Sequence, residues 1–162
     1  MKKKIENKLS EEIVRAVNRN ELETLVELVS PLNINAVDKE KRSVLFHAVL
    51  AKSIDMVKLL LKSQPDLNVK DLNGWSALHY AAQGNLTDIA KLLIENGADL
   101  EVKDDYGNTP LSRATFSSCG YGDLIKLLLS YGADRNNENN SGISPLKLAN
   151  TIANYDLKQF FE

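Results

Sequence analysis

Three side chains in this sequence have the types needed for covalent or acid–base chemistry. Cys119 is the only cysteine, and His47 and His79 are the only histidines. A loop thiol near a helix start can have a lowered pKa and act as a nucleophile. However, no aspartate or cysteine lies at a sequence spacing that would orient either histidine as its base. The glycines around Cys119 also lack the lysine that follows a phosphate-binding loop.

The same inventory bears on metals and cofactors. One cysteine and two histidines are too few ligands for a zinc site. We therefore predict a protein that is not an enzyme and has no catalytic residue, no metal site and no cofactor. An enzyme that depends on Cys119 stays open as a remote alternative.

Length and composition describe an ordinary globular chain. The chain has 162 residues, of which 43% are hydrophobic and 26% charged, enough for one domain to bury a core without disulfides. Lys and Arg number 20 against 22 Asp and Glu, so no basic excess favours nucleic acid or an anionic membrane. No stretch approaches the roughly 18 apolar residues of a membrane span. The sequence predicts a cytoplasmic protein without nucleic-acid or membrane partners.

The elements that would position any functional side chain repeat along the chain. A Leu-x-x-Ala segment recurs at intervals of 33, 33 and 35 residues, starting at Leu45, Leu78, Leu111 and Leu146. A second, apolar segment follows an aspartate and recurs at intervals of 33, 35 and 33, starting at Asp55, Asp88, Asp123 and Asp156. Comparison of the intervals locates a two-residue insertion between Leu111 and Asp123. Such repetition is the sequence signature of a solenoid.

Each repeat has the signals of two short helices and a turn. Hydroxyl residues that can cap a helix precede the first segment, at Ser43, Ser76, Thr109 and Ser144. The second segment has the apolar spacing of an amphipathic helix, and Gly97 and Gly132 end two of these helices. Turn residues such as 71–74 follow. The pattern predicts an all-α repeat solenoid of helix-turn-helix units joined by β-hairpin loops, with a second helix also at 156–162.

These residues resemble the ankyrin repeat, whose pattern is Asp-x-x-Gly-x-Thr-Pro-Leu-His-x-Ala-Ala, a helix, and Gly-Ala-Asp. Residues 71–103 match it best, through Asp71, Gly74, Leu78 and His79, with Gly97-Ala-Asp99 at the end. In residues 38–70, Lys41 and Gln64 stand where the pattern has glycine. The resemblance implies a single domain, 1–162, with an N-terminal capping repeat at 6–37, internal repeats at 38–70, 71–103 and 104–138, and a C-terminal capping repeat at 139–162. At the pattern histidine, His79 is expected to support the structure.

The resemblance also implies where a partner would bind. In this family the partner usually meets the hairpin tips and the inner surface of the first helices, which form a concave groove. The partner-binding residues expected here are Lys39, Arg42, Trp75, Asp105, Tyr106, Asn108, Phe116 and Tyr121. Trp75 and Tyr106 fall on adjacent tips, so we predict a shared hot spot there, because exposed Trp and Tyr are typical interface anchors. The alternative is that Trp75 folds back over its own hairpin.

We therefore predict a module that binds another protein and inhibits or neutralises it, for example a toxin or an enzyme. A cytosolic scaffold that holds two proteins together is the main alternative. Lys39, Lys41 and Arg42 form a small basic cluster, but acidic residues follow it along the same edge, which argues against nucleic acid. The free protein is expected to be a monomer.

Overall fold

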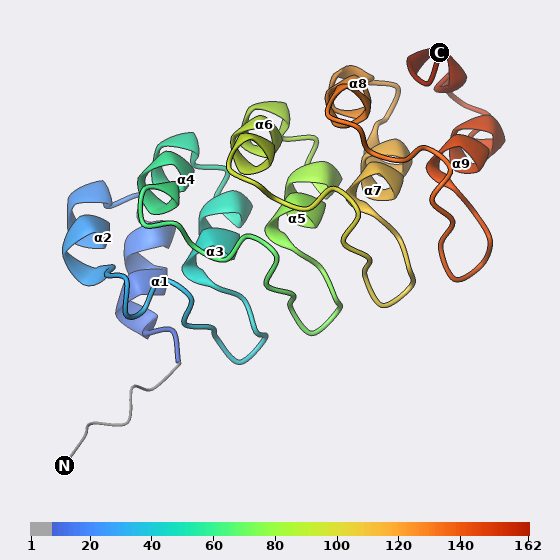
Figure 1. Ribbon diagram of the computed structural model, residues 1–162. Helices are drawn as coiled ribbons and strands as arrows, with labels where there is room; N and C mark the ends of the chain where they lie inside the picture. Colours follow the sequence, from blue (N-terminus) through green and yellow to red (C-terminus); the bar gives the residue numbers. More distant parts are fainter. Residues whose placement is uncertain (1–7) are drawn as a thin grey trace.

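The computed structural model describes residues 8–162, which form a stack of helix pairs. The helices are α1 Glu11–Asn18, α2 Leu22–Leu28, α3 Val44–Leu50, α4 Ile54–Leu61, α5 Ala77–Gln83, α6 Thr87–Glu95, α7 Pro110–Ser117, α8 Asp123–Ser130 and α9 Pro145–Thr151, followed by the 3-10 helix η1 Lys158–Phe160. Odd-numbered helices lie side by side in one row, with α2, α4, α6 and α8 in a second row (Figure 1). Extended loops project from the odd-numbered row. This is the all-α repeat solenoid that the sequence predicts.

The hydroxyl caps expected from the sequence form at two of the four helix starts, and a capping box replaces the simple cap at a third. Thr109 accepts a hydrogen bond from the Ser112 N–H at 3.3 Å, and Ser144 accepts one from the Lys147 N–H at 3.2 Å. Ser76 instead donates its backbone N–H to His79 Nδ1 at 3.1 Å, within a capping box. The expectation is wrong for Ser43, whose buried hydroxyl has no hydrogen-bond partner. The sequence explains the difference, because the position of His79 is taken in that repeat by a phenylalanine.

The projecting loops are single turns and not strand ladders. Between residues 8 and 162 the only β-type pairings are isolated bridges that join Val37 to Lys8 and to Ser43. Three of the loops turn around an aspartate and the last turns around Asn139. For example, the Asp71 carboxylate accepts the N–H groups of Asn73 and Trp75. The turn is closed by two backbone bonds, from the Asp71 N–H to the Trp75 carbonyl at 2.9 Å and from the Gly74 N–H to the Asp71 carbonyl at 3.1 Å. We call the four turns the tips; they comprise residues 39–42, 72–75, 105–108 and 140–143.

Neighbouring tips are bonded sideways to each other, which explains why they do not extend into hairpin ladders. Backbone N–H groups of one tip donate to carbonyls of the tip before it: Leu72 to Glu40 at 3.1 Å, Asp105 to Asn73 at 3.2 Å, and Asn140 to Tyr106 at 3.0 Å. Side chains add a second series of bonds between repeats, from the N–H groups of Asp66, Asp99 and Asp134 to Asn35, Asn68 and Glu101. We refer to both series as rungs, since each joins only adjacent repeats.

The core lies between the two rows of helices. Its largest buried side chains come from the repeated apolar positions, including Leu45, Leu78, Leu111, Ile89 and Leu124. These positions recur in every repeat, so one continuous apolar cluster runs along the stack. Stacking of neighbours is how a repeat that cannot bury its own apolar face becomes stable.

The C-terminal end differs from the sequence prediction. The segment 156–162, expected to be an α-helix, contains only η1, which packs beside the inserted loop. The inserted loop has glycines where the tail rings lie: an added Cβ at Gly120 would be 2.7 Å from the Tyr155 ring, and one at Gly122 would collide with the Phe160 ring. Glycine at these two positions therefore leaves room for the aromatic tail.

Candidate protein-binding face

The tips and the odd-numbered helices share one face, which we call the inner face. A pocket between α7 and α9 shows that they are contiguous, because it is lined both by tip residues (Asn108 and Ile143) and by helix residues (Arg113 and Phe116). Two exposed aromatic side chains lie on this face: Tyr106 on the tip 105–108 is 70% exposed, and Phe116 at the pocket is 66% exposed. Tyr121, also 66% exposed, lies in the inserted loop after α7. Exposed apolar groups gathered in this way are characteristic of interaction sites.

Behind the tips, each internal repeat pairs its turn aspartate with the side chain nine residues later. The three pairs are Asp38 with His47 at 3.0 Å, Asp71 with Tyr80 at 2.7 Å, and Asp104 with Arg113. These pairs contradict the expectation that no aspartate orients either histidine. A signal existed in the sequence, because both the aspartates and their partners recur every 33 residues, although the partner type changes each time.

These three pairs have a structural role. Burial, together with the hydrogen bond to Asp71, raises the pKa of Tyr80 to about 12, so this phenol stays neutral. Burial alone would raise the pKa of Asp104, but the hydrogen bonds and charge of Arg113 outweigh it and hold that pKa below its usual value. Burial lowers the pKa of His47 despite its bond to Asp38, so the ring is neutral at pH 7. Each pair fixes a tip to its own helix.

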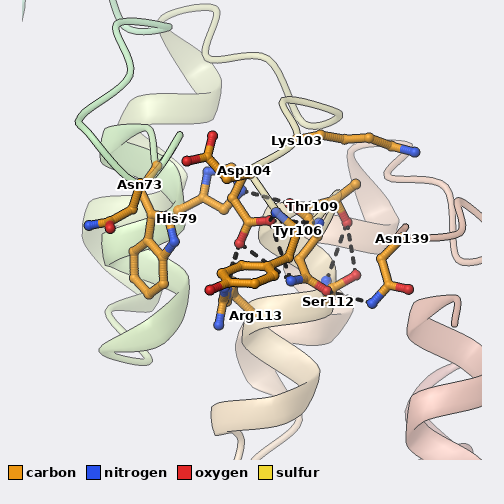
Figure 2. A network of polar contacts seen from close by, with 12 residues as sticks. Asn73, His79, Lys103, Asp104, Tyr106, Thr109, Ser112, Arg113 and Asn139 are labelled. Carbon is orange, nitrogen blue, oxygen red and sulfur yellow. Dashed lines mark hydrogen bonds and ion pairs between the residues drawn. The ribbon is translucent and has the colours of Figure 1, made fainter. Parts of the chain in front are cut away.

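Trp75 is not the free tip residue that the sequence predicts. Its indole is half-buried, with the ring centroid 5.0 Å from that of Tyr80 and 4.4 Å from the Arg113 guanidinium carbon of the next repeat. Figure 2 shows Arg113 in this network, held by Asp104. The expectation that Trp75 is an exposed residue of its tip is therefore wrong, because a planar guanidinium and a neighbouring ring both pack on the indole. The turn pattern in the sequence predicts that Trp75 lies in a turn, but it does not predict the direction in which the side chain points.

Truncation of Trp75 is expected to destabilise the protein. We expect Trp75→Ala to lower the free energy of unfolding by about 1–3 kcal/mol, since packing and a cation–π contact between two repeats are lost. Urea unfolding followed by circular dichroism measures this. Tyr106→Ala is the matched control: its ring is 70% exposed, so its effect should stay within about 0.5 kcal/mol. Equal stability of Trp75→Ala and the unmutated chain would contradict the packing role.

His79 supports the structure, as the resemblance implies. Its Nδ1 accepts the Ser76 N–H at 3.1 Å, which places the ring proton on Nε2. That Nε2–H donates to the carbonyl of Asn108 in the next repeat at 3.0 Å. The ring is fully buried, and burial lowers its pKa although the bond to Asn108 opposes this. A protonated ring could not accept the Ser76 N–H, so the fold requires neutral His79.

Stability should therefore depend on pH through the histidines. Because the pKa of His79 is lower in the folded state, the unfolded chain binds more protons below its own histidine pKa, near 6.5. This contribution to stability is complete above that pH and is lost as the pH falls toward the folded pKa. We expect the free energy of unfolding to be lower at pH 5 than at pH 7.5.

Variants identify which histidine causes the pH dependence of stability. His79→Gln removes the titrating group while keeping a side-chain amide, so urea unfolding of this variant should change less between pH 7.5 and 5 than that of the unmutated chain. His47→Gln tests the other buried imidazole in the same way. Asp38 and Asp104 do not act in this window, because their lowered pKa values act below about pH 4. An identical slope in all three proteins would contradict the role of the histidines.

The remaining residues predicted to bind a partner differ in their exposure and in whether their charges are paired. Arg42 bonds Asp38 at 3.1 Å and Glu40 at 3.0 Å, and exposed Lys39 lies 3.6 Å from Glu40, so the basic cluster is largely compensated. Asp105 is exposed at its tip. Cys119 is also exposed, in the inserted loop after α7. The uncompensated, exposed part of the predicted set is therefore concentrated around the tip 105–108 and the end of α7.

The pocket between α7 and α9 has a volume of about 240 Å³. The residues that line it include Asn108, Ser112, Arg113, Phe116, Ile143 and Leu148. Asn108 is half-buried at its edge and accepts a hydrogen bond from the Asn139 amide at 2.8 Å. The volume is below the roughly 300–1,000 Å³ typical of small-molecule sites, which suits a single side chain better than a cofactor.

Comparison with known proteins agrees with this geometry. Residues 13–104 and 65–139 match the family model described as ankyrin repeats (3 copies), so matched segments extend over residues 13–139. The chain belongs to the ankyrin-repeat family, whose members are protein-interaction modules and are generally not enzymes. A search of curated proteins finds no match to this chain.

Within residues 8–162, no group of three or more His, Cys, Asp and Glu side chains is arranged to hold a metal ion. No helix in the same part of the chain combines the length and apolarity that crossing a membrane requires.

Proposed function

We propose that this chain binds one partner protein through its inner face and inhibits it, as a monomer in the cytoplasm. The single observation that carries the proposal is the presence of two exposed aromatic side chains, Tyr106 and Phe116, on a face whose nearby charges are mostly paired. Large exposed rings bury much area with little loss of side-chain entropy, and they are the usual anchors of interfaces.

The rigidity of the stack supports the same proposal. The tips of the three internal repeats are each fixed by an aspartate pair, and rungs join all four tips, so the partner meets a preformed surface. A preformed surface reduces the ordering cost of association. Inhibition then requires no chemistry from this chain, because a rigid surface of this size blocks a partner simply by covering it.

Site-specific photo-crosslinking in the host cell tests the proposal. Benzoylphenylalanine replaces Phe116 on the inner face or, as the matched control, Lys91 on α6, which is exposed in the opposite row of helices. We expect position 116 to capture one protein species that position 91 does not. Activity of that species should fall when the purified chain is added. Equal capture from both positions would contradict the inner-face assignment, and two simultaneously captured partners with unchanged activity would favour a scaffold.

A further inference from the structure

The pocket between α7 and α9 occupies a position that is filled in the preceding repeat. Counting the repeat interval, Asn108 corresponds to Trp75 and Ser112 to His79. In the earlier repeat the indole fills the space, and buried His79 bridges to the next tip. The smaller side chains of Asn108 and Ser112 leave that space open, and the pocket of about 240 Å³ results.

The walls of the pocket also correspond to those around the indole. Trp75 lies between Tyr80 of its own repeat and Arg113 of the next, at 5.0 and 4.4 Å. One repeat further, the equivalent walls are Arg113 and Leu148, and both line the pocket. Trp75 is not among the lining residues, so the pocket meets a side of Arg113 that the indole does not cover.

The electrostatics favour an aromatic occupant. The guanidinium of Arg113 is charged and already fixed by Asp104, whose carboxylate is fully buried. A fixed cation attracts the negative face of an aromatic ring, whereas it gives no such attraction to an aliphatic side chain. Phe116 and Ile143 add apolar contacts at the rim.

We propose that the pocket between α7 and α9 receives an aromatic side chain of the partner protein, which stacks on Arg113 as Trp75 does from the other side. This inference rests on the proposed function and specifies the chemistry of the partner: an exposed Trp, Tyr or Phe on a segment that reaches the tip 105–108. The partner's ring takes the place that an indole of this chain fills one repeat earlier.

Nuclear magnetic resonance titration of the whole chain tests the pocket without the partner. The probes are N-acetyltryptophanamide and, as the aliphatic comparison, N-acetylleucinamide, both uncharged. We expect the aromatic probe to shift the signals of Ser112, Arg113 Nε and Phe116 saturably, and to bind roughly threefold to fivefold more tightly than the aliphatic probe. Equal binding of both probes, or no saturable shift at these residues, would overturn the proposal.

Two variants at one position provide the control. Asn108→Trp should fill the pocket from within and abolish the probe shifts, while Asn108→Ala leaves it open and keeps them. Trp75 and Asn108 have the same backbone hydrogen bonds. In each, the backbone N–H donates to the carboxylate of the turn aspartate, and the backbone carbonyl accepts from the N–H of that aspartate. The backbone of this tip therefore accepts an indole side chain. Probe shifts that persist in Asn108→Trp would overturn the proposal. Should that variant not fold, the comparison of the two probes on the unmutated chain still decides.

The partner identified by crosslinking separates this inference from the proposed function. Asn108→Trp should weaken that partner's binding about tenfold or more, whereas Lys91→Glu on α6, in the opposite row of helices, should leave it within about threefold. If crosslinking from position 116 succeeds but Asn108→Trp binds normally, the inner face stands and the aromatic pocket is wrong. If position 116 captures nothing while the probe binds as expected, the proposed function fails and the pocket remains a ring-binding site.

Discussion

Replacement of Gly107 by alanine is expected to lower the free energy of unfolding by about 2–4 kcal/mol, a large part of the stability of an ordinary domain. Gly107 has φ +78°, a conformation that costs an alanine about 1–2 kcal/mol. An added Cβ would also lie 2.8 Å from the backbone nitrogen of Asn140 on the next tip. That nitrogen donates a rung to Tyr106, so relief of the contact must disturb the joint between two repeats.

Gly132→Ala is the matched control for this prediction. Gly132 has φ +93°, but an added Cβ there would meet nothing within 4 Å. Its replacement should therefore show the backbone cost alone, about 1–2 kcal/mol. Urea unfolding of both variants measures the difference, which isolates the tip-to-tip contact. Equal losses in the two variants would mean that adjacent tips can separate without cost.

The second large effect concerns binding. Tyr106→Ala and Phe116→Ala are each expected to weaken association with the partner by roughly 30-fold, which corresponds to about 2 kcal/mol. Both rings are mostly exposed in the free protein, so their loss should leave the fold intact. Calorimetric titration beside thermal unfolding separates the two effects, because only the affinity should change.

Lys91→Glu supplies the control for that measurement. Lys91 is exposed on α6 and lies 3.9 Å from Glu95, in the row of helices away from the tips. Reversal of its charge should change the affinity by less than about threefold, as expected for a surface ion pair outside an interface. A tenfold loss from Lys91→Glu, or normal binding by both aromatic variants, would place the interface elsewhere.

The sequence predicts the backbone of this fold well because the same local signals are repeated. Thr109 and Ser144 cap their helices as expected, and Gly97 and Gly132 have the left-handed conformation expected at helix ends. The position within the repeat even outweighs the conformational preference of the residue. Gln64 stands where the pattern has glycine, yet it takes the same left-handed conformation, with φ +49°. Stacking on both sides fixes this turn more strongly than the preference of one residue.

Side-chain directions between repeats were harder to predict. The turn signal around Trp75 gives no information about Arg113 of the next repeat, which lies 38 positions later and holds the indole inward. The open pocket beside Asn108 was missed for a related reason, since a cavity arises from several small side chains whose neighbours are known only in the folded stack. The helix predicted for residues 156–162 does not form, because the contacts of this segment with the inserted loop compete with helix formation.

The rungs have a consequence for the behaviour of the chain under mechanical load. Neighbouring internal repeats are joined by both kinds of rung, one between tips and one in which a backbone N–H donates to an amide or carboxylate side chain, and each end repeat is joined to its neighbour by one of the two kinds. Interactions in such a stack reach only the nearest neighbour. A pulling force applied to the two ends would therefore peel repeats from an end one at a time, in steps of about 33 residues. The protein would then unfold under force in several similar steps and not in one event.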